Sequence, residues 1–316
     1  MQTASSSATL REHVLDLVWS LWAELGVSSW TRHHQQWAID PEPLIVFTAR
    51  VSESDRRLRD EAIDWCIRYG GYVSVTRLRN LLKDEPSEVL AAFDTFAAIV
   101  NAHSNLSWPS KAAAPVYRPT GRSLLSSFAA PALIALRLRA LFGVAARADI
   151  LRVLVAQPSR SFTASDLVPE VNYTKRNIDN ALDSLVMAGL LEVRLVRNQH
   201  QYRLADAARL LGFIGERPQV FPRWTPIFSS LAAILDIAAS AAGLEPVIQL
   251  VEVSRGFHLL APTLDLAGLV GPPGQISGSD AWTAFMQWAD EITSGLARGD
   301  ASVLRDRPQP HGGLPA

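Results

Sequence analysis

The chain has 316 residues, of which 48% are hydrophobic and 19% are charged, and this composition predicts a folded protein with about two domains. Its 30 Lys and Arg residues are balanced by 31 Asp and Glu residues, which excludes a basic nucleic-acid coat protein, although one domain can still be basic. The single cysteine, Cys66, excludes an internal disulfide and a cysteine-rich metal site, and it fits a reducing cytoplasm.

The sequence shows no pattern typical of export or of membrane insertion. Its first ten residues are polar and lack the basic start and apolar run of a signal peptide. The two most apolar segments, residues 123–136 and 224–235, extend over 14 and 12 residues before a charge, whereas a spanning helix needs about 20. We therefore expect a cytoplasmic protein without a membrane partner.

Residues 1–103 are expected to form a helical domain. Apolar residues recur at helical spacing in residues 8–25, where they form a broad stripe that ends at Gly26. The same pattern predicts further helices over residues 41–50, 54–69, 74–83 and 86–103.

Residues 104–131 interrupt this helical pattern. They contain Pro109, Pro115, Pro119 and Pro131. Since proline ends helices, we expect a linker or an extended strap across the surface. The next segment, residues 132–142, is predicted to be a helix with Arg137 and Arg139 on its polar side.

Residues 147–205 carry a specific series of patterns. Helices are predicted over residues 147–156, 164–171 and 174–188, with a short extended piece over residues 161–163. Apolar and polar residues alternate from Leu191 to Leu204 around a polar tip at residues 197–200, which predicts a β-hairpin. This order is that of a winged helix-turn-helix. We therefore predict a mainly α protein, in which a central winged helix-turn-helix domain (residues 132–205) with a small β-hairpin wing is flanked by helical domains.

Residues 206–298 are expected to form the second flanking helical domain, and residues 299–316 a disordered tail. Helices are predicted over residues 224–242, 245–261 and 281–298. Because the first and last of these are strongly apolar, we expect them to provide the surface of a homodimer.

The predicted helix 174–188 carries the residues with the clearest chemistry. Ile178, Ala181, Leu182 and Leu185 form one apolar stripe at helical spacing, and the opposite side is polar. Arg and Asn side chains match guanine and adenine edges in a major groove, while a helix N-terminus and a lysine suit phosphates. The residues predicted to contact DNA from this segment are Tyr173, Thr174 (as the N-cap), Lys175, Arg176, Asn177 and Asn180.

The predicted wing, residues 194–203, supplies further DNA-contacting residues, which are Arg194, Arg197, His200 and Arg203. From residue 118 to residue 209 the chain has 13 Lys and Arg residues against 7 Asp and Glu residues, whereas the remainder has 17 against 24. The positive charge is thus concentrated on the segment with the docking pattern, which favours DNA binding over a merely solvated helix face.

These motifs carry a family resemblance. Tyr173-Thr174-Lys175-Arg176-Asn177-Ile178 resembles the start of a recognition helix, and residues 185–192, Leu-Val-Met-Ala-Gly-Leu-Leu-Glu, resemble the passage from that helix into a wing. Residues 147–205 are similar in this respect to bacterial transcription regulators of the ArsR and MarR type. The resemblance implies a dimeric regulator that binds double-stranded DNA. The metal sensing of ArsR proteins is not implied, because this segment has only His200 as a soft ligand.

Enzyme chemistry is not indicated. The sequence lacks the glycine-rich phosphate-binding motifs, H-E-x-x-H and G-x-S-x-G, and the adjacent pair His33-His34 has the wrong spacing for a helical zinc site. We therefore expect no enzyme activity, no cofactor and no metal. The alternative function is a protein-interaction or antitoxin-like module that uses the winged helix as a scaffold to dock a protein partner.

Overall fold

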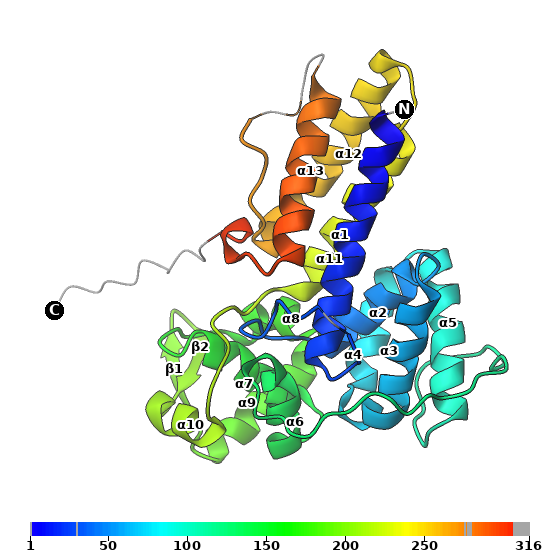
Figure 1. The fold of residues 1–316 in the computed structure, drawn as a ribbon. Coiled ribbons are helices and arrows are strands. Elements are labelled where there is room, and N and C mark those ends of the chain that lie inside the picture. The colour runs from blue at the N-terminus through cyan, green and yellow to red at the C-terminus, as the bar shows by residue number, and fades with distance from the viewer. Residues whose placement is uncertain (1, 30, 275, 277–279, 306–316) are drawn as a thin grey trace. The chain divides into compact units, whose positions relative to one another are not determined.

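The computed structural model describes residues 2–29, 31–274, 276 and 280–305 (Figure 1). Within these residues the protein is mainly helical, with 13 α-helices and a small two-stranded antiparallel sheet, which confirms the mainly α prediction. Residues 18–222 form one compact unit, and residues up to 17 together with those from 223 onward form another. The domain boundaries predicted after residues 103 and 131 therefore lie inside a single unit.

The first part of the larger unit is a group of helices. They are the end of α1 (Gln2–Glu24), then α2 (Pro41–Val51), α3 (Arg56–Tyr69), η1 (Gly70–Tyr72), α4 (Val75–Leu81), η2 (Leu82–Asp84) and α5 (Ser87–Ala102). Trp22 and Trp65 lie at the core of this group, with their rings edge to face at 5.4 Å. Asp55 and Ser74 cap α3 and α4 by accepting hydrogen bonds from backbone amides. The helices predicted here from periodicity are present, with shifted ends.

Residues 104–130, which we name the strap, contain neither helix nor strand, as the prolines predicted. The strap is fastened to α3. Asp64 accepts hydrogen bonds from the amides of Thr120 and Gly121 at 2.7 and 2.8 Å, and the Tyr69 hydroxyl accepts one from the amide of Leu125 at 2.8 Å. The strap is therefore a packed part of the unit, although residues 113–116 are exposed.

The second part of the larger unit comes after the strap. It consists of η3 (Pro131–Leu133), α6 (Ile134–Phe142), α7 (Ala146–Ala156), α8 (Ala164–Val171), α9 (Lys175–Met187), β1 (Leu191–Val196), β2 (Gln199–Leu204) and α10 (Ala207–Ile214). Phe162, in the predicted extended piece, pairs with Tyr202 through two backbone hydrogen bonds of 2.8 and 2.9 Å. Helix, short extended piece, helix, helix and hairpin thus occur in the predicted order. The helix α10 was not predicted.

Side-chain caps set the ends of these helices. Thr163 and Asp166 form a reciprocal capping box at the start of α8, and Asn172, in the left-handed conformation with φ of 55°, ends it. Thr174 is the N-cap of α9, as predicted, and accepts a hydrogen bond from the amide of Asn177. The turn from α8 into α9 is therefore fixed by local sequence.

The smaller unit contains the start of α1, α11 (Trp224–Ala241), α12 (Pro246–Ala267), α13 (Ala281–Ala297) and η4 (Ala301–Val303). The prediction that the middle helix ends near residue 261 was wrong, because α12 continues through Pro262 to Ala267. Residues 299–305 are ordered, in contrast to the predicted tail. The Arg305 guanidinium lies 2.7 Å from Asp265, while residues 306–316 of that tail lie outside the described residues.

Helix α11 is long and apolar enough to cross a membrane by length and composition alone. Of its 18 residues, 56% are buried inside the protein, as is common for a core helix. The apolar side chains of α11 and α13 that were expected to form a dimer surface, such as Ile227, Leu231, Phe285 and Trp288, are buried in the smaller unit. The dimer surface is therefore not available where it was predicted.

Candidate functional site

The polar face of α9 is exposed, and the opposite stripe is buried, as the helical spacing predicted. Ile178, Ala181, Leu182 and Leu185 are all less than 8% exposed and belong to the core formed with α7 and α8. The polar side chains form one continuous exposed face that begins at the helix N-terminus. Its members among the predicted DNA-contacting residues are Thr174, Lys175, Arg176, Asn177 and Asn180.

Tyr173 does not belong to this exposed face, and its predicted role was wrong. The side chain is 5% exposed, and its hydroxyl lies 2.8 Å from Ser74 Oγ and 3.2 Å from Asp149 Oδ2. The reason is that Thr174 has extended backbone angles as the N-cap, so Tyr173 precedes the helix and does not share its angular spacing. Burial raises the pKa of Tyr173 above its usual range, so its hydroxyl stays neutral.

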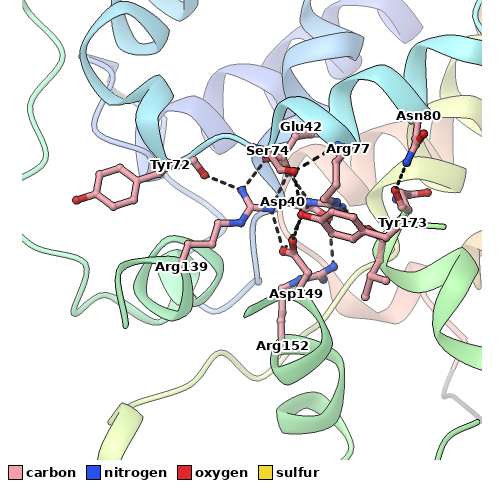
Figure 2. Close-up of polar contacts among 12 residues, drawn as sticks. Asp40, Glu42, Tyr72, Ser74, Arg77, Asn80, Arg139, Asp149, Arg152 and Tyr173 are labelled. Carbon is pink, nitrogen blue, oxygen red and sulfur yellow. Dashed lines mark hydrogen bonds and ion pairs between the residues drawn. The ribbon is translucent and has the colours of Figure 1, made fainter. Parts of the chain in front are cut away.

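Tyr173 reaches a buried group of six charged side chains, which we name the ion cluster (Figure 2). Every member is less than 8% exposed, and three carboxylates face three guanidinium groups, so the cluster is neutral as a whole. The members come from the start of α2, from α4, from α6 and from α7. They are Asp40, Glu42, Arg77, Arg139, Asp149 and Arg152.

Arg77 is the centre of the ion cluster. Its two terminal nitrogens donate to both oxygens of Asp40 at 2.6 Å, one of them also donates to Glu42, and its Nε donates to the carbonyl of Val171 at 2.9 Å. Arg152 approaches Asp40 from α7 at 3.3 Å. Burial acts to raise the pKa of Asp40, but Arg77 and Arg152 outweigh it and hold that pKa well below its usual range.

Arg139 was predicted to lie on the polar side of its helix, and this prediction was wrong. It is 2% exposed and donates to both oxygens of Glu42 at 2.7 and 2.9 Å and to Asp149 at 2.9 Å. A paired and bidentate arginine can be buried because the carboxylates accept hydrogen bonds from both of its terminal nitrogens. The ion cluster thus joins α2 and α4 on one side of the strap to α6 and α7 on the other.

Arg137 binds backbone carbonyls, whereas Arg139 binds the carboxylates of the ion cluster. Its guanidinium donates to the carbonyls of Phe128, Ile214 and Glu216 at distances of 2.6 to 2.8 Å. These bonds hold the end of the strap against the segment that comes after α10. The guanidinium of Arg137 is therefore hydrogen-bonded to backbone carbonyls of the larger unit.

The hairpin of β1 and β2 closes with a two-residue turn. Arg197 and Asn198 have φ of 48° and 61°, the positive values that a type I′ hairpin turn requires at both central positions. The turn is shorter than the predicted tip, since Gln199 and His200 already belong to β2. Arg197 and His200 are both exposed at this end of the hairpin.

The other two predicted cations of the wing are partly neutralised. The Nε and Nη2 atoms of Arg203 donate to one oxygen of Glu192 at 3.0 and 2.8 Å, and Arg194 lies 3.8 Å from the same oxygen. Hydrogen bonds from Arg203 lower the pKa of Glu192, so this carboxylate remains ionised between the two arginines. Arg197 is consequently better placed than Arg194 or Arg203 to meet an external anion.

The hairpin also exposes apolar side chains. Val193, Leu195 and Val196 on β1 are 41%, 67% and 40% exposed, and Met187 at the end of α9 is 89% exposed. In the described part of the chain, β1 pairs only with β2 and leaves its other edge open. Exposed apolar groups on an open strand are typical of a protein-contacting surface.

Burial of the ion cluster removes little of the positive charge counted between residues 118 and 209. Of the 13 basic and 7 acidic residues between residues 118 and 209, the two arginines 139 and 152 and the carboxylate of Asp149 are buried. Eleven basic and six acidic residues then remain outside the cluster, a balance of +5. The local excess of positive charge is therefore retained.

The described residues contain no candidate metal centre, and the chain matches no known family. Among the described residues, no group of three or more His, Cys, Asp or Glu side chains could hold a metal ion. Comparison of the chain with protein-family models, with curated proteins and with solved structures finds no match.

Proposed function

We propose that residues 146–204 form a winged helix-turn-helix that binds double-stranded DNA. In this proposal α9 is the recognition helix, the hairpin of β1 and β2 is the wing, and Phe162 supplies its third short strand. The observation that carries the proposal is the exposed polar face of α9, on which Lys175, Arg176, Asn177 and Asn180 extend from the helix N-terminus. This fits the resemblance to ArsR and MarR regulators.

Each side chain has a role set by its chemistry and place. Arg176 and Asn180 lie one helical turn apart, so both can meet base edges in the same major groove. The amides at the start of α9 and Lys175 suit a phosphate, and Arg197 at the wing tip suits the backbone of an adjacent groove. Tyr173 contacts no DNA in this scheme and positions the start of α9 from the buried side.

A protein partner is the second candidate, and the exposed apolar groups of the hairpin favour it. Leu195 and Met187 would be left in water by a wing that contacted only phosphates. A partner that added a strand to the open edge of β1 would cover them. The proposed experiment separates the two candidates because DNA binding must weaken steeply with salt.

The test is recovery of genomic DNA fragments by the tagged protein, with affinity then measured on the recovered site and on random DNA across a salt series. Arg176→Ala and Asn180→Ala are each expected to cost about 1 to 3 kcal/mol on the recovered site and little on random DNA. Arg197→Ala is expected to weaken both similarly and to reduce the salt slope by about one. Arg56→Ala, which removes an exposed arginine from α3, is the matched control and should change neither.

A protein that recovers no DNA at low salt, or an Arg176→Ala variant that binds both DNAs as the parent does, would refute DNA reading by α9. Retained binding to a protein through the hairpin, lost in Leu195→Asp, would then support the second candidate.

A further inference from the structure

Helix α12 presents an exposed apolar stripe along its length. Val253, Leu260, Leu264 and Ala267 form its buried side and are less than 5% exposed. The opposite side, where a helix at the surface normally carries polar residues, is largely apolar. Its exposed members, with Leu244 two residues before the helix, are Leu244 (36%), Val247 (74%), Ile248 (53%), Val251 (57%), Leu259 (71%) and Leu266 (54%).

This stripe is the one apolar helix face of the smaller unit that is not used inside it, judged on the described residues. The apolar sides of α11 and α13 are buried. The exposed apolar residues of α12 lie on both sides of the exposed Arg255 and His258, and an apolar helix face of this kind is typical of a helix that pairs with another protein surface. The charged residues beside the stripe then indicate which protein surface pairs with α12.

We propose that α12 pairs with the α12 of a second copy of the chain, antiparallel about a two-fold axis that passes between residues 253 and 254. A two-fold interface is self-complementary, so that if one residue contacts a second, the second contacts the first across the axis. With this axis, Ile248 of each copy lies opposite Leu259 of the other. Leu244 falls opposite Thr263, and Val251 falls opposite Gly256, next to Arg255.

Charge complementarity favours this register. Glu252 and Arg255, which form an ion pair of 2.7 Å within one helix, are also equidistant from the proposed axis. Glu252 of one copy therefore faces Arg255 of the other, and two such pairs flank the apolar contacts. An axis placed at residue 255 would instead set Arg255 against its own copy and Glu245 against Asp265, which are like charges. The charge pattern thus favours the axis between residues 253 and 254 over the axis at residue 255.

This inference does not depend on DNA binding. If both hold, a two-fold dimer supplies two recognition helices, as symmetric operators require. The dimer and DNA binding are tested separately, since dimerisation is measured in the absence of DNA.

The first experiment is sedimentation of the full chain over a concentration series, up to tens of micromolar. The parent protein is expected to form a dimer. Ile248→Asp should weaken the dimer by more than about tenfold, because it places a charge against Leu259. An acidic residue in the first turn is compatible with the helix, and Ile248 is half exposed, so the fold should be kept. Val116→Asp, a change at a fully exposed apolar residue of the strap, is the matched control and should dimerise as the parent does.

The second experiment tests the register by exchanging charges. Glu252→Arg makes both positions basic and Arg255→Glu makes both acidic, so each variant alone should dimerise weakly. An equimolar mixture of the two variants should form a heterodimer, because each basic position then faces an acidic one. If the substitutions acted only by breaking the Glu252–Arg255 ion pair within one helix, mixing the two variants would not restore dimerisation.

A parent protein that stays monomeric at tens of micromolar, or an Ile248→Asp variant that dimerises as the parent does, overturns the proposal. The register is overturned if Glu252→Arg and Arg255→Glu each dimerise as the parent does and mixing them does not strengthen dimerisation. Specific DNA binding by a strict monomer would leave the proposed function standing while the dimer fails, and a dimer without DNA binding would do the reverse.

Discussion

Asp40 is held in its ionised form by arginines from two different helices. The unfolded chain takes up the Asp40 proton near pH 4, whereas the folded chain does not, because Arg77 and Arg152 keep its pKa well below that range. The unfolded state therefore binds more protons there, and the free energy of unfolding rises with pH. The stabilisation from Asp40 is present above about pH 4 and is lost as the pH falls below it.

Asp40→Asn tests this directly. The amide keeps the shape of the side chain but removes the negative charge that faces the buried Arg77 and Arg152. We therefore expect the free energy of unfolding to fall by about 3 to 5 kcal/mol at neutral pH. The difference between variant and parent should shrink on acidification below about pH 4, because the unfolded parent then binds a proton at Asp40 that the folded parent does not. Urea unfolding from pH 7 to pH 3 measures both quantities. A loss that is the same at every pH would mean that Asp40 contributes only packing.

Tyr173→Phe removes one hydroxyl from the ion cluster. Its partners, Ser74 and Asp149, are buried and lose a hydrogen bond, so we expect a cost of about 1 to 2 kcal/mol. Arg176→Ala, three residues away but exposed, should change stability by less than about 0.5 kcal/mol. Chemical denaturation of the two variants compares them. Equal effects would contradict the division between a buried anchor and an exposed face.

For single residues, the sequence could identify the exposed polar face of α9 but not the ion cluster. The spacing of Ile178, Ala181 and Leu182 placed the polar residues of α9 correctly, because a helix fixes their direction. It could not place Tyr173, which lies outside the helix, or Arg139, whose partner Glu42 is 97 residues away. The available signal was charge inside apolar runs, since Arg152 lies between Leu151 and Val153 and Glu42 lies before Leu44.

Among the elements, the hairpin turn depends on two residues with positive φ. Asn tolerates this conformation, and Gly tolerates it better, whereas a β-branched residue is strained. Asn198→Val should therefore loosen the hairpin by about 1 to 2 kcal/mol, which corresponds to amide exchange in β1 and β2 faster by about 5- to 30-fold. Asn198→Gly is the matched variant and should exchange no faster than the parent. Hydrogen exchange measured by mass spectrometry reads out both, and equal exchange in the two variants would argue against a type I′ turn.

Helix positions were largely predictable because periodicity and caps are local signals. The ends of α8 are set by Thr163, Asp166 and Asn172, and the predicted range of that helix matches the observed one. Tertiary packing decided the remaining cases. Helix α12 continues past Pro262 because Leu264 and Ala267 are buried beyond it, and α10 holds its place through Leu210 and Ile214.

For the whole molecule, the strap is the predicted site of cleavage, and the ion cluster determines whether the cleaved fragments separate. Lys111 and Arg122 are exposed at either side of the exposed residues 113–116, so trypsin is expected to cut there first among the described residues. The two fragments should stay together in gel filtration, since Arg77 binds Val171 and Arg139 binds Glu42 across the cut. Fragments that separate without denaturant would mean that residues 18–222 are not one unit.

The ion cluster also governs how this sequence can change over evolutionary time. A substitution at Arg77, Asp40 or Glu42 alone leaves a buried charge without its partner, and such a variant is removed by selection for folding. Drift at these positions must therefore proceed through compensated pairs, or through replacement of the whole set by apolar side chains of similar volume. Related chains should accordingly show positions 40, 77 and 152, and positions 42, 139 and 149, varying together. The exposed residues of α9 are free of this constraint, so the surface that meets a partner can diversify on an interior that is inherited intact.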